Sequence, residues 1–346
     1  MLAADGRLLK LASLASFSSA RSRSRRYAAA ANIVSVNRHP TAMEFMMTPF
    51  PRSWRVTALI ASVGFALAPA AAPAQLVDTS FVSKGVRIHY VEQGRGVPVV
   101  LIHGIEGTLA GWRRVPIFSD LARDYRVIAI DQRGHGRSDK PHEAAAYGRE
   151  MALDVVRLLD HLGLAKAHVV GYSLGAMVTS QLLTLHPERF RSAVLIAGAG
   201  RLVWNASLAE VANVEARERD AQCISPTLMA RLRPPTEPAP TAERLRALSA
   251  ACIADTTQDR FALAALTRSR ADQVVAPAAG AAVTVPTLAI VGSLDPLKAD
   301  LDALKVLRPS IEYVVVDSAT HSGVRGILTR SETLTALRTF LRRPLP

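Results

Sequence analysis

Several motifs that commonly carry cofactor chemistry are missing from this 346-residue sequence. It contains no P-loop, no Gly-x-Gly-x-x-Gly after a strand-like run, and no clustered His and Cys at metal-binding spacing. It also has no internal repeat, and no apolar run reaches the ~20 residues that a membrane-spanning helix needs. We therefore expect neither a cofactor nor a resident metal ion, and no stable membrane span in the mature chain.

Acidic residues are fewer than basic ones, 29 against 42, and the formal net charge is +13. Such an excess suggests a nucleic-acid or membrane partner. The excess is uneven, however, because the first 74 residues hold nine basic and only two acidic residues. The rest of the chain has 33 basic and 27 acidic residues, a balance expected for solubility. We therefore expect no nucleic-acid partner, and the sequence does not indicate an oligomeric state.

Residues 46–74 have the features of a secretory signal peptide. Two arginines precede the apolar run Val56–Ala68, and Ala72-Pro73-Ala74 follows it. A charged region, a short apolar region and an A-x-A site occur in that order in exported proteins. We expect a periplasmic or secreted protein whose mature chain begins at Gln75, with an uncleaved interfacial anchor as the alternative.

Residues 1–45 are rich in Ser, Ala and Arg and nearly free of acidic residues. That composition resembles an organellar transit peptide. A complete signal peptide, however, begins at Met46 or Met47. We therefore interpret residues 1–45 as a mis-assigned or disordered N-terminal extension and leave them out of the fold argument.

Strand-like and helix-like segments alternate from residue 75 onward. Val97–Ile102 is continuously apolar, which is typical of a strand buried on both faces. Met151–Leu162 has apolar residues at helical spacing. The alternation predicts an α/β fold with a mainly parallel twisted sheet and helices on both faces. The other expected strands are Phe81–Ser83, Val86–Glu92, Arg126–Asp131, Ala167–Tyr172, Arg191–Ile196, Pro286–Val291 and Ile311–Asp317, and the other expected helices are Leu109–Arg123, Leu174–Leu185, Leu297–Leu307 and Ser331–Leu341.

Residues 200–285 interrupt this alternation between two expected strands. They contain helical patterns at Ala206–Glu218 and Ala242–Ile253 and a proline-rich loop. We predict that residues 75–199 and 286–346 form the core and that residues 200–285 form a helical cap over the strand ends. A surface decoration away from any site is the alternative. Four arginines of the segment are expected to be solvated rather than to bind an anionic substrate: Arg231, Arg233, Arg244 and Arg246.

Cys223 and Cys252 are the two cysteines of the chain, and both lie in the expected cap. In an oxidising compartment they could form a disulfide. The sequence does not supply the geometry, so pairing and two buried free thiols remain equally open.

The strongest chemical signal is the pentapeptide Gly171-Tyr172-Ser173-Leu174-Gly175. It follows an apolar strand and opens a helix, which is the context of a nucleophile elbow. The small flanking residues let strand and helix approach closely, and the helix N-terminus directs its positive end toward the serine. The pattern predicts that Ser173 is a catalytic nucleophile.

A serine hydroxyl needs a general base, and for this elbow the base follows the serine in the chain. Only His186 and His321 come after Ser173. His186 lies at the end of the helix that follows the elbow, where it should face away from the site. His321 lies in a loop after a late strand, so we predict that His321 is the base.

The acid of such a triad should lie one strand earlier than the base. Asp295 follows the strand Pro286–Val291 and precedes His321 by 26 residues, room for one helix and one strand. Its carboxylate would accept the Nδ1–H of the base. Asp295 could also cap a helix that has Pro296 at its first position. Asp300 and Asp302 are alternatives inside that helix.

An oxyanion formed during acyl transfer needs two hydrogen-bond donors. One expected donor is the backbone N–H of Leu174, directly after the nucleophile. The other is the N–H of Ile105, in the loop that follows the early buried strand. His103 in the same loop is expected to be structural, with a catalytic role as the alternative.

From about Phe81 to Leu341, the chain resembles the α/β-hydrolase superfamily, in its branch with an inserted cap. Besides the elbow, three strings carry the resemblance: Val99 to Gly104, Asp131 to Asp139 and Gly292 to Pro296. The chain departs from many relatives at Ile105-Glu106, where they have an aromatic residue or Pro.

The resemblance implies acyl transfer, because relatives with Asp at the elbow are haloalkane dehalogenases and epoxide hydrolases whereas this chain has Ser173. The expected function is hydrolysis of a carboxylic ester through an acyl-enzyme. Lactone hydrolysis, carbon–carbon bond hydrolysis and perhydrolysis use similar triads and stay open. A non-catalytic ligand receptor of the same fold is a further alternative.

Overall fold

The computed structural model describes residues 75–344. The predicted signal peptide (46–74) and N-terminal extension (1–45) lie outside the described residues. Within residues 75–344, every helix is too short or too polar to cross a bilayer.

Eight strands and eleven α-helices make up the described part of the chain. The strands are β1 (Val77–Ser83), β2 (Val86–Gln93), β3 (Pro98–Ile102), β4 (Arg126–Ile130), β5 (Ala167–Tyr172), β6 (Phe190–Ile196), β7 (Thr287–Gly292) and β8 (Glu312–Val316). The helices are α1 (Leu109–Arg114), α2 (Pro116–Leu121), α3 (Arg149–His161), α4 (Leu174–Leu185), α5 (Ala206–Gln222), α6 (Pro226–Leu232), α7 (Ala242–Ala254), α8 (Arg260–Arg268), α9 (Pro277–Ala281), α10 (Lys298–Leu307) and α11 (Ser331–Leu341).

The strands form one sheet in the order β1-β2-β4-β3-β5-β6-β7-β8. The opening hairpin β1–β2 is antiparallel and pairs antiparallel with β4, and every later pair is parallel. The predicted α/β class is thereby confirmed. The carboxyl ends of the parallel strands share one edge of the sheet, so loops from distant parts of the sequence meet there.

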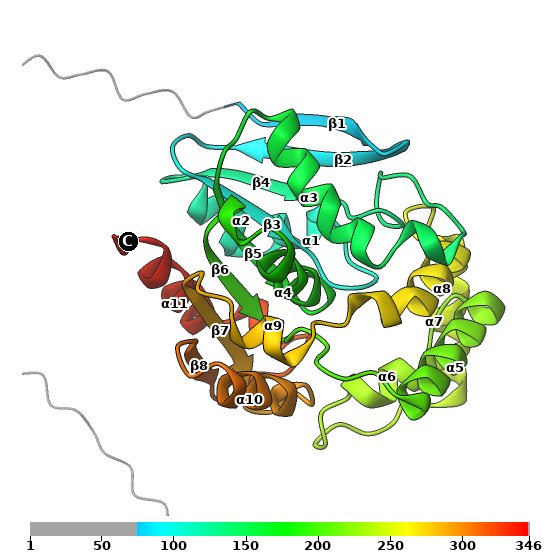
Figure 1. The fold of residues 1–346 in the computed structure, drawn as a ribbon. Helices are drawn as coiled ribbons and strands as arrows, with labels where there is room; N and C mark the ends of the chain where they lie inside the picture. Colours follow the sequence, from blue (N-terminus) through cyan, green and yellow to red (C-terminus); the bar gives the residue numbers. More distant parts are fainter. Residues whose placement is uncertain (1–74, 345–346) are drawn as a thin grey trace, which may run out of the picture. The chain divides into compact units, whose positions relative to one another are not determined.

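Helices cover both faces of the sheet (Figure 1). Alternate residues of β3 point to opposite faces: Val100 and Ile102 join the apolar cluster under α3 and α4, whereas Val99 and Leu101 join the cluster under α1, α2 and α11. Burial on both faces explains why this strand reads as a continuous apolar run.

One expected helix is wrong in its extent. The stretch Leu109–Arg123 forms two short helices, α1 and α2, which are separated at Val115. Pro116 has no N–H to continue the first helix and disfavours helical geometry at the preceding residue, so it begins α2 as its first residue instead. Elsewhere the expected core strands and helices form within a few residues of their predicted ends.

The loop after β4 is organised by the buried carboxylate of Asp131. Its Oδ1 accepts the backbone N–H of Leu109 at 2.7 Å, and its Oδ2 accepts that of Arg137 at 3.0 Å. The ring of His89, on β2, lies between two carboxylates, with Nδ1 2.7 Å from Asp131 Oδ2 and Nε2 2.9 Å from Asp78 Oδ1. The motif after β4 is therefore structural in this chain: it holds α1, β2 and the loop together.

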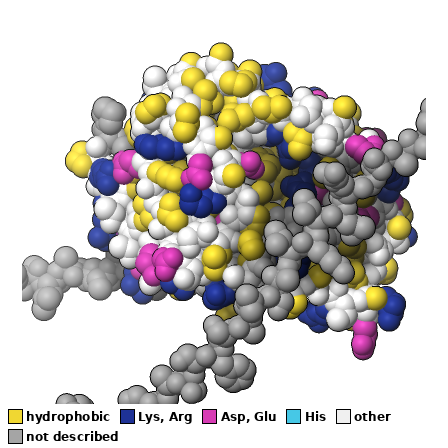
Figure 2. All heavy atoms as spheres, turned by 90° about the horizontal axis from the view of Figure 1, so that it is seen from below, with side chains coloured by type: hydrophobic (Ala, Val, Ile, Leu, Met, Phe, Trp, Pro, Cys, Tyr) yellow, Lys and Arg dark blue, Asp and Glu magenta, His cyan; other side chains and the backbone are white. Residues whose placement is uncertain are grey.

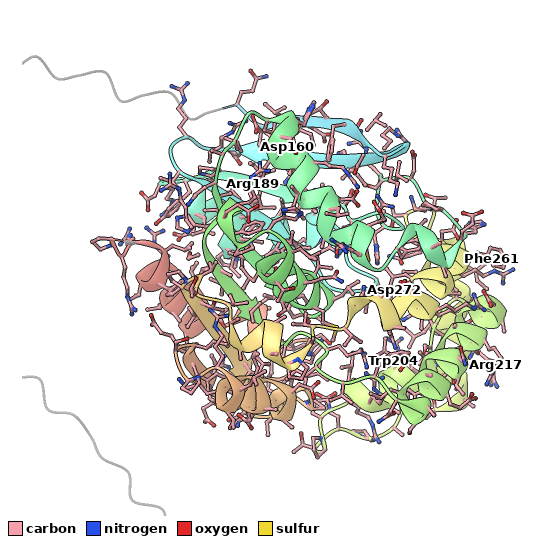
Figure 3. All side chains as sticks on the ribbon, in the orientation of Figure 1. Asp160, Arg189, Trp204, Arg217, Phe261 and Asp272 are labelled. Atoms are coloured by element: carbon pink, nitrogen blue, oxygen red, sulfur yellow. A yellow bond between two sulfur atoms is a disulfide. The ribbon has the colours of Figure 1, made fainter. Side chains whose placement is uncertain are left out.

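The inserted segment, residues 200–285, carries α5 to α9 between β6 and β7. Helices α5 to α8 gather at one side of the sheet, to the right in Figure 1. Arg217 and Phe261 lie at the outer side of the segment, whereas Asp272 lies beside the core and accepts the Gln181 amide through its backbone oxygen at 2.6 Å (Figure 3). Helix α9 contacts α4 and α10, so the segment packs against the core again before β7 begins.

Buried charges join the helices of the segment. The buried face of α5 follows helical spacing at Ala212, Glu215, Ala216 and Arg219, and therefore includes two charged residues. Glu215 pairs with Arg270, and with Arg231 at 2.8 Å. Because removing one partner would leave a buried charge unpaired, these pairs specify how the helices pack.

A disulfide joins Cys223, at the end of α5, to Cys252 in α7, with the Cα atoms 5.9 Å apart. The sequence alone left this pairing open. Helix α7 has no buried residue, and besides the disulfide a hydrogen bond from Ser249 Oγ to the Gln222 carbonyl at 2.7 Å connects it to α5. The disulfide therefore limits how far residues 224–251, which lie between the two cysteines, can move from the rest of the segment.

The pairing of His89 predicts a specific pH dependence of stability. Burial alone would lower the pKa of His89, but the hydrogen bonds to Asp131 and Asp78 outweigh it and raise the pKa above its ordinary value of 6.5. A raised native pKa means that this stabilisation is complete below pH 6.5 and is lost as the pH rises through the native value. We expect the difference in unfolding free energy between the wild type and His89→Gln to shrink as the pH rises from 5.5 to 9, as measured by urea denaturation. A difference that stays constant across this range contradicts the assignment.

Loss of the disulfide should loosen one stretch of the chain. Closing a loop of 29 residues stabilises the folded state by about 3–4 kcal/mol in the chain-entropy model. We expect Cys252→Ser to lower the unfolding free energy by about that amount, and limited proteolysis to cut first within residues 224–251. The control is reduced wild type, which should give the same first cleavage sites; unchanged stability and cleavage on reduction would contradict the role of the disulfide.

Candidate active site

Ser173 stands in a strained turn between β5 and α4. Its backbone has φ +54° and ψ −114°, a conformation that non-glycine residues rarely adopt. The Ser173 N–H donates to the Ile196 carbonyl of β6 at 2.8 Å, and α4 begins at the next residue. The turn therefore holds the hydroxyl at the carboxyl edge of the sheet, as the pentapeptide predicts.

Two glycines allow this turn to form. A Cβ on Gly171 would lie 2.2 Å from the Gly175 carbonyl oxygen, and a Cβ on Gly175 would lie 2.1 Å from the Ile102 carbonyl oxygen of β3. Strand and helix therefore approach so closely that no side chain fits between them. The small residues on either side of Ser173 are a packing requirement of the site.

The structure brings Ser173, His321 and Asp295 together. His321 Nε2 lies 3.0 Å from Ser173 Oγ, and His321 Nδ1 lies 2.9 Å from Asp295 Oδ2. All three residues are at most 6 % exposed. Such a hydrogen-bonded chain can orient the imidazole, withdraw the hydroxyl proton and stabilise the imidazolium that results.

Asp295 has a second hydrogen bond that fixes its carboxylate. Oδ1 accepts the backbone N–H of Leu297 at 2.8 Å, while Oδ2 faces His321. The expected helix cap with Pro296 at the first position is wrong, because α10 begins at Lys298 and Leu297 precedes it. The carboxylate stabilises a turn before the helix, and this turn directs its other oxygen toward the imidazole.

The residues that the sequence offered as alternatives lie elsewhere. Asp302 binds Lys298 at 2.8 Å and accepts the Tyr313 hydroxyl at 2.6 Å, and Asp300 is exposed on α10. His186 lies at the end of α4, where its Nδ1 is 3.2 Å from Glu188. None of the three takes part in the hydrogen-bonded chain at Ser173.

Tyr172 is a site residue that the sequence argument did not single out. Its hydroxyl donates to the His321 backbone carbonyl at 2.8 Å, and the two rings lie 5.5 Å apart. Burial raises the pKa of the Tyr172 hydroxyl, so it remains a donor at physiological pH. Tyr172 thereby holds the histidine loop against the elbow; the only signal in the sequence is its place directly before the serine.

The loop after β3 lies beside Ser173. It turns from Gly104 to Gly107, whose N–H donates to the Gly104 carbonyl at 3.1 Å, with Ile105 and Glu106 in the middle. Among residues 75–344, the N–H groups of Ile105 and Leu174 donate to no protein acceptor. Both amides are therefore free to bind an oxygen, while their role as oxyanion donors remains a prediction.

His103 supports this loop from below. Its Nδ1 donates to the Gly104 carbonyl at 2.7 Å, and its Nε2 accepts the Gln132 N–H at 3.1 Å. Both ring nitrogens are occupied by backbone groups, and burial lowers the pKa of His103, which favours the neutral ring. This geometry matches the structural role expected for His103.

Glu106 connects the loop to the inserted segment. Its side chain lies 2.6 Å from the fully buried guanidinium of Arg219 on α5, and its backbone oxygen accepts the Gln258 amide at 3.1 Å. The unusual residue in this loop is thus bound from two points of the segment, one before α6 and one after α7. The position of the loop therefore depends on the segment.

A cavity of about 620 Å³ opens over Ser173. Its floor comes from the loop after β3, the elbow and the loop of His321. Half of the described residues that line it lie in the inserted segment: Leu228, Met229, Leu232, Arg233, Pro234, Glu237, Pro238, Pro240, Arg244 and Leu248. The volume suits a small organic ligand.

Two of the four arginines that were expected to be solvated, Arg244 and Arg246, are exposed, and Arg231 and Arg233 are partly buried. Arg233 and Arg244 line the cavity over Ser173. Arg231 instead pairs with the buried Glu215.

Among residues 75–344, no group of three or more His, Cys, Asp or Glu side chains is placed to hold a metal ion.

A family model described as "alpha/beta hydrolase fold" matches residues 97–324. The chain is 43% identical over 107 residues to the dihydrolipoyllysine-residue acetyltransferase component of the acetoin cleaving system of Pseudomonas putida, covering 30% of this chain and 28% of that protein. It is 41% identical over 120 residues to epoxide hydrolase B of Mycobacterium tuberculosis, covering 33% of each.

Solved structures extend the similarity beyond these local matches. Est816, described as an N-acyl homoserine lactone degrading enzyme, is 28% identical, with a TM-score of 0.61 over 75% of this chain and 99% of that one. By contrast, the chain spans about a third or less of the two curated relatives above.

The packing at the elbow predicts the outcome of two alanine substitutions. Gly175→Ala would force a Cβ against the Ile102 carbonyl, so we expect it to lower the unfolding free energy by about 1–3 kcal/mol and to reduce activity by displacing Ser173. The matched control is Gly111→Ala in α1, where a Cβ meets nothing within 4 Å and alanine should be neutral or stabilise by about 0.5–1 kcal/mol. Chemical denaturation measures both. Equal stability of the two variants would contradict the packing argument.

Proposed function

The chain belongs to the family of the alpha/beta hydrolase fold, and from this premise we propose that it is a serine hydrolase that cleaves carboxylic esters. The observation that carries the proposal is the hydrogen-bonded chain from Ser173 Oγ through the ring of His321 to Asp295, with distances of 3.0 and 2.9 Å. A serine, an imidazole and a carboxylate in this order are the parts of an acyl-transfer site.

In the first half of the reaction, Ser173 Oγ attacks the ester carbonyl carbon while His321 Nε2 takes the hydroxyl proton. Asp295 accepts the hydrogen bond from Nδ1 and stabilises the imidazolium. The negative charge moves to the carbonyl oxygen, which the N–H groups of Ile105 and Leu174 would bind. The tetrahedral intermediate then collapses, the alcohol leaves with the proton from His321, and Ser173 keeps the acyl group.

In the second half, water takes the place of the alcohol. His321 removes a proton from the water as it attacks the acyl carbon, and returns the proton to Ser173 Oγ as the acid is released. Because His321 and Asp295 are buried, the attraction between the carboxylate and the imidazolium formed in these transfers is stronger than it would be in water.

Lactone hydrolysis is a second candidate for the same site. The similarity to Est816, described as a lactone-degrading enzyme, extends over three quarters of this chain. Ring opening requires the same attack by Ser173, and differs in that the alcohol stays attached to the acyl group. Although the chain is also similar to epoxide hydrolase B, its Ser173 favours attack on a carbonyl.

We also propose that residues 200–285 act as a cap and that the protein is exported. Support for the cap is that half of the described cavity lining belongs to this segment.

Support for export is the sequence of residues 46–74 together with the disulfide, since disulfides persist in oxidising compartments. On the face shown in Figure 2, basic side chains are scattered among apolar and acidic ones, as a surface that serves solubility would have.

The proposed function predicts covalent labelling and loss of activity in two variants. A fluorophosphonate should label the wild type at Ser173, as identified by peptide mass spectrometry. Ser173→Ala and His321→Ala should each lower kcat for p-nitrophenyl esters by about 10⁴-fold or more, because members of such a triad act as a unit.

The matched control is His186→Ala, which removes the partly exposed histidine at the end of α4 and should keep wild-type activity. Full esterase activity of Ser173→Ala, or failure of the wild type to react with the fluorophosphonate, overturns the proposed mechanism.

A further inference from the structure

We propose that the preferred substrate carries a carboxylate at a distance from the scissile carbonyl, and that Arg233 and Arg244 bind this carboxylate. The inference rests on the proposed function and adds the substrate class to it. The part of the cavity over Ser173 that the inserted segment lines would then be an anion-binding subsite.

The lining of the cavity carries more positive than negative charge. Three arginines line it, Arg233, Arg244 and Arg325, together with two glutamates, Glu106 and Glu237. The three come from separate places along the chain: the end of α6, the first turn of α7 and the loop after His321. Their meeting at one cavity is a property of the fold and cannot be read from a local run of charges.

Both glutamates lie beside arginines other than Arg233 and Arg244. Glu106 pairs at 2.6 Å with Arg219, which is fully buried and does not line the cavity. Glu237 lies 4.0 Å from Arg325. These pairs leave the two arginines of the inserted segment as the cations of the lining that carry no counter-charge.

Arg233 is held in place without being neutralised. Its Nη1 donates to the backbone carbonyl of Glu237 at 2.8 Å, which positions the guanidinium at the cavity wall. Among residues 75–344, no carboxylate oxygen lies within 4.0 Å of Arg233 or Arg244. A guanidinium with free N–H groups in a concave site is suited to bidentate binding of a carboxylate.

Apolar side chains lie in the same lining as these arginines. They are Ile105, Leu228, Met229, Leu232, Leu248 and Val324. An ester that places its carbonyl at Ser173 and its carboxylate at the arginines would have a hydrocarbon chain between the two, in contact with these residues. Partial removal from water strengthens the attraction between the carboxylate and the guanidinium.

Two p-nitrophenyl esters of equal length test the inference. One is the half-ester of adipic acid, which has a free carboxylate, and the other is the corresponding monoamide, which is neutral. The ratio of their kcat/KM values measures the preference for charge and cancels effects on the chemical step. We expect the wild type to favour the carboxylate ester by about tenfold or more, since hydrogen bonds to charged groups are the strong ones.

Arg233→Gln and Arg244→Gln should each lower this ratio by about threefold or more, mainly through a higher KM for the carboxylate ester. The matched control is Arg246→Gln, which removes an exposed arginine two residues away on α7 that does not line the cavity. It should keep the wild-type ratio. Raising the ionic strength should lower the ratio of the wild type.

Failure of the inference and failure of the proposed function give different results. Equal kcat/KM values for the two esters, with Ser173-dependent cleavage of both, overturn the anion-binding subsite and leave the esterase in place. Absence of cleavage and of fluorophosphonate labelling overturns the proposed function. In that case calorimetry with Ser173→Ala still tests the subsite: tighter binding of the carboxylate ester than of the monoamide supports it, and equal binding overturns it.

Discussion

The close approach of β5, α4 and β3 at the elbow is the constraint on which the site depends. With a glycine at positions 171 and 175, the first turn of α4 can lie directly against the end of β3. This contact forces the serine backbone into its strained conformation and sets the hydroxyl above the sheet. The strain is tolerated because the Ser173 N–H is tied to β6 and the helix that follows is buried.

The parallel sheet then brings the other two residues to the serine. His321 is 148 residues from Ser173 in the chain, yet their side chains are in hydrogen-bond contact. The acid and histidine loops follow neighbouring strands and are joined by backbone bonds, including Leu294 N–H to the Ala319 carbonyl at 3.0 Å. The relative position of imidazole and carboxylate is thus set by the pairing of β7 with β8.

The core fold and the three central side chains could be predicted from the sequence because their signals are local. The apolar run of β3, the spacing of the elbow and the order of serine, acid and histidine are each visible in the residues themselves. The break before Pro116 is equally local, because the proline itself marks it. Tyr172 was not identified, because its partner is a backbone carbonyl that only the fold brings near.

The inserted segment is where sequence reasoning was weakest. Helices α6 and α8 were not expected, and Arg219, which follows the expected helix Ala206–Glu218, is fully buried against Glu106. The burial of Arg219 depends on tertiary packing, which the spacing of residues along the sequence does not reveal. The positions of Arg233 and Arg244 at the cavity over Ser173 likewise depend on tertiary packing, because they result from how α6 and α7 pack.

The disulfide has a consequence for how such a protein can diverge. Residues 224–251, which supply half of the described cavity lining, form one uninterrupted stretch between Cys223 and Cys252. The hydrogen bonds among Ser173, His321 and Asp295 involve no residue of that stretch. Substitutions at the lining positions between the two cysteines can therefore change the cavity wall, while Ser173, His321 and Asp295 keep their geometry. The lining of the cavity and the hydrogen-bonded chain at Ser173 can therefore change independently of one another in the sequence.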